Sequence, residues 1–205
     1  MPGRVVRTGD IARDILERSI GRAPSPDRVP DWPLDPAAPF LFATLHRAEL
    51  VGDPGLLAGV VTALGRLELP VVLAAHPRTR SVLDRHGHGG HVHMMPPLGY
   101  LETIACIRDA RAVITDSGGV QREAYWLGTP CATVRHETEW LETVEAGANV
   151  LVPPARAPDG LADVVAERLH RRASGAAWDR GSYGAGDAAA RIRDAIREWA
   201  GSRPA

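Results

Sequence analysis

The feature that most constrains this chain is a regular alternation of short apolar runs with longer segments of helical spacing. Runs that are apolar throughout lie at 40–45, 71–75, 112–115, 131–134 and 149–152, and a weaker one lies at 91–95. Strands that are apolar at every position, rather than at every second one, are typical of parallel sheets covered on both faces. The sequence therefore predicts an α/β fold with a doubly wound parallel sheet and helices on both of its faces.

Helices are expected where apolar residues recur every three to four positions. Such segments lie at 10–20, 53–66, 99–109, 119–127, 159–172 and 187–199. Residues 22–39 contain six prolines and are expected to form a linker or surface loop, because proline interrupts both helix and sheet. The predicted organisation is an N-terminal helix with a proline-rich linker (1–39), a central α/β domain (40–173), and a C-terminal loop and helix (174–205).

Composition excludes several classes of chemistry. All 24 basic residues are arginines, which excludes Schiff-base lysine chemistry and a P-loop lysine. The 25 acidic residues balance them, so neither nucleic acid nor an anionic membrane is an expected partner. No apolar stretch approaches the ~20 residues of a membrane span, and the first residues lack an apolar leader, so a cytoplasmic location is expected. Cys106 and Cys131 lie in apolar runs and are expected to be buried thiols.

Polar residues follow several of the predicted strands at the point where each strand ends. His46 follows the first strand, His76 the second, and Arg135 the run at 131–134. The stretch Asp116-Ser117-Gly118-Gly119 follows the run at 112–115. In open α/β sheets ligands bind outside the carboxyl ends of the strands, so these residues are the candidates for a binding site.

The turn at 116–119 is the most informative of these segments. Its two glycines expose backbone N–H groups at the start of a helix, where the helix dipole favours an anion such as phosphate. An ordinary strand-to-helix turn capped by Ser117 fits the same residues. Glu123 lies in the second turn of that helix and is either a ribose-binding carboxylate or a solvated surface residue. The pattern is neither a P-loop nor a dinucleotide fingerprint, and no cofactor is expected.

Four histidines form a second cluster, at positions 86, 88, 91 and 93. On a strand, His91 and His93 would share a face, as metal ligands do. A polar glycine-rich loop with solvent-facing histidines explains the cluster equally simply. No carboxylate or cysteine joins it at ligand spacing, so no metal site is expected.

Several segments, in order along nearly the whole chain, resemble the C-terminal half of the non-hydrolysing UDP-N-acetylglucosamine 2-epimerases. They are Thr8-Gly9-Asp10, Thr44-Leu45-His46-Arg47-Ala48-Glu49, His76-Pro77-Arg78-Thr79-Arg80, Pro97-Leu98-Gly99-Tyr100-Leu101, 115–123, 135–147 and 183–188. The resemblance implies half of a glycosyltransferase B-type architecture, in which the 40–173 domain is a Rossmann-like UDP-binding domain.

The resemblance also implies roles for individual residues. Ser117, Gly118 and Gly119 would contact the diphosphate, and Glu123 the ribose. His46 and Arg135 would lie beside the diphosphate and the sugar, with His46 as the candidate catalytic residue. Residues Leu98 and Thr103 would flank the uracil.

This sequence departs from the family pattern at several positions. Leu45 and Leu50 replace glycine and asparagine of many members, and Thr103 replaces a larger apolar residue expected to pack on the base. Trp140-Leu141 stands where some members have Arg-Pro, and the Thr138-Glu139-Trp140 form resembles relatives that act on modified or oxidised UDP-sugars. The N-terminal half of the family, with the carboxylates thought to move the C2 proton, has no counterpart in the sequence.

Three functions follow from these observations. The first is the UDP-sugar-binding half of an epimerase that inverts C2 of UDP-N-acetylglucosamine, or of a modified UDP-sugar, with a separate or deleted N-terminal Rossmann-like half as partner. The second is a non-catalytic UDP-sugar-binding module. The third is the donor-binding half of a glycosyltransferase. On the first hypothesis the isolated chain is expected to be inactive.

Overall fold

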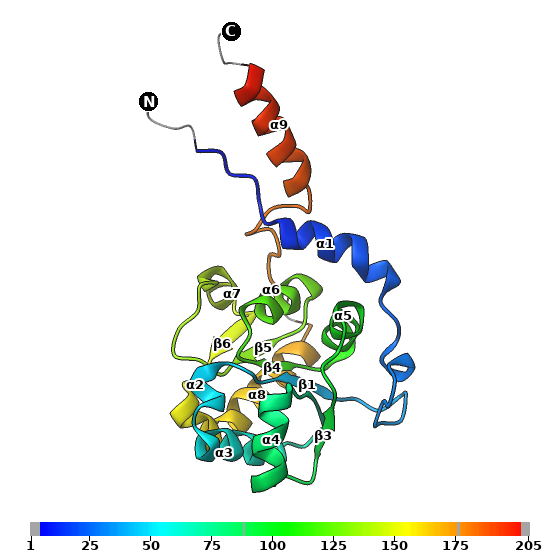
Figure 1. The fold of residues 1–205 in the computed structure, drawn as a ribbon, viewed down its shortest axis with the longest axis vertical. Coiled ribbons are helices and arrows are strands. Elements are labelled where there is room, and N and C mark those ends of the chain that lie inside the picture. Colours follow the sequence, from blue (N-terminus) through cyan, green and yellow to red (C-terminus); the bar gives the residue numbers. More distant parts are fainter. Residues whose placement is uncertain (1–4, 88, 176, 202–205) are drawn as a thin grey trace.

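A six-stranded parallel sheet forms the centre of the molecule (Figure 1). The computed structural model describes residues 5–87, 89–175 and 177–201. The strands run in the order β3-β2-β1-β4-β5-β6. Their bounds are β1 Leu41–Thr44, β2 Val71–Ala74, β3 Val92–Met95, β4 Val113–Thr115, β5 Cys131–Thr133 and β6 Asn149–Leu151. All six predicted strands are present, including the weak run at 91–95, and every pairing is parallel.

The order of the strands places two chain segments side by side that lie far apart in the sequence. Strand β4 pairs with β1, so that Thr44 lies opposite Thr115, and their hydroxyl oxygens are 2.7 Å apart. After β1 the chain continues to β2 on one side of this pair, and after β4 it continues to β5 on the other side. The carboxyl ends of β1 and β4 therefore form the switch point at which open α/β sheets bind ligands.

Helices cover both faces of the sheet, as predicted. Helices α3 (Pro54–Leu64), α4 (Pro77–His86) and α8 (Ala157–Ala173) pack on one face, against a core that includes Leu41, Leu73 and Ile114. Helices α5 (Tyr100–Asp109) and α6 (Gly118–Leu127) pack on the other, against Phe42, Val72 and Val113. Successive strand residues thus point to opposite buried layers, which explains why the runs are apolar at every position.

Three short or polar helices were not expected from the apolar spacing. Helix α4 buries few apolar side chains, among them Val82 and Leu83, and most of its residues are polar. Helices α2 (Ala48–Val51) and α7 (Leu141–Glu145) have only four and five residues. An apolar periodicity needs more than one turn to be visible, so segments of this kind carry too little signal.

The proline-rich segment runs along the sheet and is packed there. One 3-10 turn, Pro26–Arg28, lies within it, and another, Ile20–Arg22, ends at its first residue. Val29 is 3% exposed, and the ring of Trp32 meets Phe40 edge-on at 5.1 Å. The segment is irregular, as predicted, but it also contributes to the core on the α5 and α6 side.

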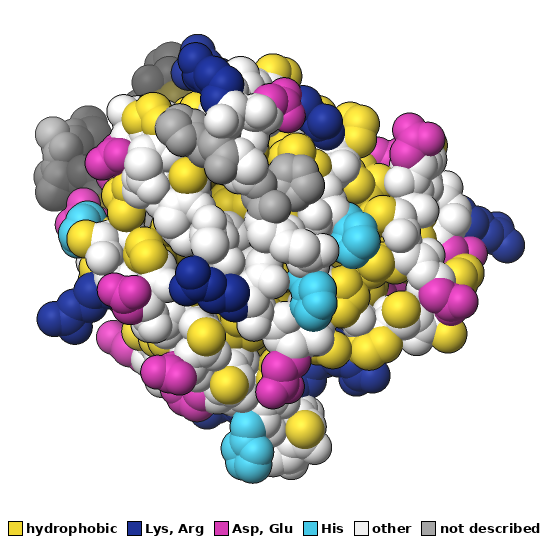
Figure 2. Space-filling model, turned by 90° about the horizontal axis from the view of Figure 1, so that it is seen from below, with side chains coloured by type: hydrophobic (Ala, Val, Ile, Leu, Met, Phe, Trp, Pro, Cys, Tyr) yellow, Lys and Arg dark blue, Asp and Glu magenta, His cyan; other side chains and the backbone are white. Residues whose placement is uncertain are grey.

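Helix α1 (Ile11–Ser19) lies over α5 and α6. Helix α9 (Ala188–Gly201) extends from the body beside the irregular chain segment that precedes α1 (Figure 1). Asp14 joins α1 to α9, since its carboxylate accepts the backbone N–H groups of Ala188 and Ala189 at 3.0 and 2.8 Å. Among the described residues, no helix is both long and apolar enough to cross a membrane. On the face shown in Figure 2, basic and acidic side chains are interspersed.

Candidate functional site

The centre of the candidate site is a contact between His46 and Asp116 at the ends of β1 and β4. The backbone N–H groups of His46 and Arg47 both donate to one oxygen of the Asp116 carboxylate, at 2.8 Å each. The ring nitrogen Nδ1 of His46 lies 3.3 Å from the other carboxylate oxygen. Asp116 is fully buried, whereas the His46 side chain is 47% exposed. Asp116 therefore fixes the loop after β1 and leaves the Nε2 edge of the imidazole open.

Asp116 belongs to the candidate stretch 116–119, but no role of its own and no contact with His46 was predicted for it. Burial raises the pKa of its carboxyl group, and the N–H of Arg47 and the His46 ring oppose that rise. A histidine whose Nδ1 faces a carboxylate is held in one orientation, and its Nε2 is then available to accept or donate a proton. The His-to-Asp spacing of 70 residues carried no local signal; only the position of each at a strand end could have suggested the contact.

The amino end of α6 lies next to this pair. Ser117 occupies the N-cap position, but its hydroxyl makes no capping hydrogen bond, contrary to the simple capped-turn alternative. Its backbone N–H donates to Thr115 Oγ1 at 3.0 Å, and its carbonyl accepts from Gln121. The next three N–H groups, of residues 118–120, point out of the helix end as in any first turn. The arrangement suits an anion at this end of α6.

Arg135, at the end of β5, is nearly buried and already has a carboxylate partner. Its guanidinium forms two hydrogen bonds to Glu139, at 2.9 and 3.0 Å. Glu139 also lies 3.9 Å from the guanidinium of Arg47, so the loops after β1 and β5 are joined through it. Hydrogen bonding from Arg135 lowers the pKa of Glu139 to about 2, and this carboxylate is charged at neutral pH.

Residues expected at the base and ribose end lie around the start of α5. Leu98 is half-buried against the core, and the N–H of Thr103 donates to the Gly99 carbonyl at 2.9 Å in the first turn of α5. Glu123 lies close enough to Tyr100 for a side-chain hydrogen bond. The Glu123 side chain is half-buried in this position.

Burial raises the pKa of Glu123 to about 7, against opposing contributions from Arg122 and the Tyr100 hydrogen bond. Between pH 4.5 and 7 the folded state therefore binds more protons than the unfolded state, and stability falls as the pH rises through this window. We expect Glu123→Gln to match the parent at pH 4 and to exceed its free energy of unfolding by roughly 1–3 kcal/mol at pH 8. Urea unfolding at both pH values measures this, and an equal pH dependence in parent and variant would contradict it.

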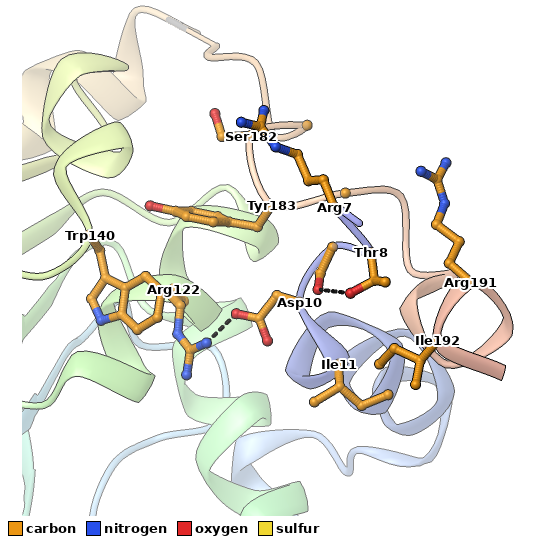
Figure 3. A pocket seen from close by; sticks show the side chains of 13 residues that line it. Arg7, Thr8, Asp10, Ile11, Arg122, Trp140, Ser182, Tyr183, Arg191 and Ile192 are labelled. Atoms are coloured by element: carbon orange, nitrogen blue, oxygen red, sulfur yellow. Dashed lines mark hydrogen bonds and ion pairs between the residues drawn. The ribbon is translucent and has the colours of Figure 1, made fainter. Parts of the chain in front are cut away.

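A cavity of about 820 Å³ lies between α6, the 181–184 segment, α9 and the chain before α1 (Figure 3). Asp10, Arg122 and Tyr183 line it, together with Trp140 from the loop before α7. Arg122 pairs with the carboxylate of Asp10, and its guanidinium carbon lies 3.9 Å from the centre of the Trp140 ring. None of the eight residues expected to bind ligand lines this cavity.

The histidine cluster does not gather into a site in the part of the chain that the structure describes. Nδ1 of His91 lies 2.9 Å from the carbonyl oxygen of Leu67. His88 is outside the described residues, and no group of three metal-ligating side chains is found within them. Cys106 and Cys131 are buried free thiols, as expected.

Comparison with known proteins assigns the chain to a family. The family described as UDP-N-acetylglucosamine 2-epimerase matches residues 1–197. A UDP-2,3-diacetamido-2,3-dideoxy-D-glucuronate 2-epimerase of Pseudomonas aeruginosa is 41% identical over an alignment of 195 residues, and the match covers 93% of this chain and 52% of that protein. The match covers 52%, 33% and 55% of the length of three curated relatives, so the chain spans about half of such a protein or less.

Solved structures agree with this assignment. The Methanocaldococcus jannaschii UDP-GlcNAc 2-epimerase in complex with UDP-GlcNAc and UDP superimposes with a TM-score of 0.75 at 27% identity, over 93% of this chain and 54% of that one. The calicheamicin glycosyltransferase CalG4 shares the fold, with a TM-score of 0.55 at 20% identity over 84% of this chain and 45% of that one. The sheet is thus one Rossmann-like half of a glycosyltransferase B-type fold, and the chain belongs to the UDP-N-acetylglucosamine 2-epimerase family, to whose C-terminal half it corresponds.

Proposed function

We propose that this chain is the UDP-sugar-binding half of an isomerase that inverts C2 of UDP-N-acetylglucosamine or of a modified UDP-sugar. The observation that carries the proposal is the His46–Asp116 contact beside the open amino end of α6, at the switch point of the sheet. A nucleoside diphosphate fits this edge, because backbone N–H groups at a helix end stabilise phosphate charge.

In the reaction that the family implies, a base removes the C2 proton while the bond between C1 and the diphosphate breaks, which leaves a double bond between C1 and C2. A proton is then returned to the opposite face of C2 as UDP adds back to C1, and C2 is thereby inverted. Departure of UDP places negative charge on the phosphate oxygens. The end of α6, Arg135 and the open Nε2 edge of His46 supply the groups that stabilise this charge. Glu139 takes two of the five guanidinium N–H donors of Arg135, which leaves other N–H groups for a phosphate.

The ligand runs along the carboxyl edge of the sheet on this proposal. Leu98 and Thr103, at the start of α5, flank the uracil. Glu123 accepts hydrogen bonds from the ribose hydroxyls. Placing a carboxylate there requires its burial beside Tyr100, and this burial raises its pKa. The helix end of Ser117, Gly118 and Gly119 holds the diphosphate, and the sugar lies toward His46 and Arg135.

The partner is an N-terminal Rossmann-like half, which closes the site and supplies the base at C2. Two exposed apolar pairs support a covering domain. Ile192 and Ile196 on α9 are 37% and 59% exposed, and Ile11 and Ile15 on α1 are 46% and 50% exposed. Each pair is spaced by four residues and so lies on one side of its helix. Of the described α9 residues only Ala188 is buried.

Two UDP-sugars, for which relatives of the chain are named, are the candidate substrates. The 41% identity is to a protein named for a diacetamido-glucuronate substrate, and the 28% identity to the Escherichia coli UDP-N-acetylglucosamine 2-epimerase is lower. Arg47, whose side chain is 36% exposed, lies near Glu139 and is available to a sugar carboxylate. Activity of the completed enzyme on each of the two UDP-sugars decides between them.

We expect this chain to bind UDP more tightly than UMP, and UMP more tightly than uridine, because the helix end and Arg135 act on phosphate. Arg135→Ala should weaken UDP binding by about 1–3 kcal/mol, as loss of a charge-assisted contact does, and Ser117→Ala by less, because the backbone N–H groups remain. Isothermal calorimetry with the three ligands measures this. Equal affinity for all three would refute the phosphate site.

A further inference from the structure

Trp140 lies against the same helix end that is proposed to hold the diphosphate. A Cβ added at Gly118, the first residue of α6, would lie 2.9 Å from the indole nitrogen of Trp140 and 3.7 Å from a carboxylate oxygen of Glu139. Contacts of a real Cβ at such a distance are essentially absent from proteins, so the indole occupies the space that a side chain at 118 would need. The indole N–H therefore stands beside the first backbone N–H groups of α6.

Buried hydrogen bonds hold Trp140 in this position. Its backbone N–H donates to Thr138 Oγ1 at 3.1 Å, and that hydroxyl donates to the side chain of Gln121 at 2.7 Å. Asn149 donates to the same Gln121 oxygen at 3.2 Å. Because Gln121 belongs to α6 and Asn149 to β6, the loop that carries Trp140 is tied to the helix it faces.

The indole ring is also held on its face and its edge. Arg122 lies over the ring, 3.9 Å from its centre, and Tyr183 meets it at 5.6 Å and 81° (Figure 3). A guanidinium over an indole face is an attractive cation–π contact. Within the described residues the indole N–H has no hydrogen-bond acceptor. It is also absent from the buried side-chain atoms that lack a partner, so it is not sealed inside the protein. It is a fixed donor that is open to a ligand.

We propose that Trp140 is a ligand-contacting residue whose indole N–H donates to an oxygen of the second phosphate of the nucleoside diphosphate; this rests on the proposed function. Glu123 places the ribose on the α5 side of α6, whereas Trp140 reaches the helix end from the loop after β5. A diphosphate that starts at the ribose and crosses the end of α6 brings its second phosphate to Trp140. The Glu139 carboxylate nearby is paired with Arg135 and Arg47, so its charge does not stand alone against the phosphate.

Trp140→Phe tests the proposal, because it keeps an aromatic ring for Arg122 and Tyr183 but removes the N–H. Calorimetry is done on parent and variant with UDP, UMP and uridine. We expect UDP to bind about tenfold more weakly to the variant, as for loss of a hydrogen bond to a charged group, with UMP affected less than threefold and uridine unchanged. A UDP affinity within twofold of the parent overturns the role of Trp140, and so does an equal loss for all three ligands.

Gly118→Ala is an independent test that does not remove the indole. In the parent it displaces the ring and should weaken UDP binding; in the Trp140→Phe background, where no indole is displaced, the loss should be smaller. Equal losses in both backgrounds overturn the contact. Failure of the proposed function would look different. If the parent does not bind UDP more tightly than uridine, the chain has no phosphate site. If the parent prefers UDP but the variants bind it as tightly as the parent, the phosphate site exists and Trp140 is not part of it.

Discussion

The complete two-domain enzyme is expected to exchange the C2 proton of its UDP-sugar with solvent, and this chain alone is not. A C2 proton with no adjacent carbonyl is weakly acidic, so a positioned base is required, and such a base contributes about 10²–10⁴-fold. The acidic residues closest to the candidate site are occupied. Asp116 binds the His46 loop, Glu139 binds Arg135, and Glu123 lies beside Tyr100.

His46→Ala in the completed enzyme should lower C2 exchange by about 10²–10³-fold, the range for losing one donor to the charge that develops on the departing diphosphate, with a smaller effect on UDP affinity. The measurement is deuterium incorporation at C2, detected by NMR in D₂O, for this chain, for its mixture with a separately expressed N-terminal half, and for the variant mixture. His170→Ala is the matched control, because that histidine is exposed on α8 and away from the strand ends.

Each outcome of this experiment separates the functions considered for the chain. Exchange by this chain alone would mean that the base lies in the C-terminal half. No exchange with the N-terminal half present, together with tight UDP binding, would favour a non-catalytic UDP-sugar-binding module. Exchange that survives His46→Ala unchanged would remove His46 from the chemistry.

Asp116→Ala is expected to lower the free energy of unfolding by about 3–5 kcal/mol, a large part of the 5–15 kcal/mol of a typical domain. The substitution leaves two backbone N–H groups, of His46 and Arg47, without their buried acceptor. Each hydrogen bond to a charged group contributes about 1.5–3 kcal/mol. Urea unfolding monitored by circular dichroism measures the loss, and a loss below 1 kcal/mol would show that the loop after β1 has another support.

Two further substitutions locate the cause of the expected loss. Asp116→Asn keeps one side-chain oxygen, which can accept both N–H groups as the single carboxylate oxygen now does, and should be much less destabilising. Asp53→Ala removes an exposed N-cap that accepts one N–H, from Leu56 at 3.0 Å, and should cost about 1 kcal/mol. The assignment would be contradicted if Asp116→Asn or Asp53→Ala lowered the free energy of unfolding more than Asp116→Ala does.

The strands and the long helices were predictable because their signal is local. A strand covered on both faces needs an apolar side chain at every position, and a helix packed on one face needs one every three to four residues. The segment 112–123 carried both patterns and the glycines between them, so the strand, the turn and the start of α6 followed from twelve neighbouring residues. Helix α4 was missed because most of its residues are polar.

By itself, the sequence determined the class of fold, the loops in which the candidate ligand-binding residues lie, and through its motifs the family. Only the tertiary structure decided which of those residues meet. The Asp116 carboxylate reaches His46 because β4 pairs with β1, and Trp140 reaches Gly118 because a buried network ties its loop to α6. The same short apolar runs are compatible with other strand orders. Contacts across 70 residues therefore depend on how the strands are arranged and packed, which no local pattern encodes.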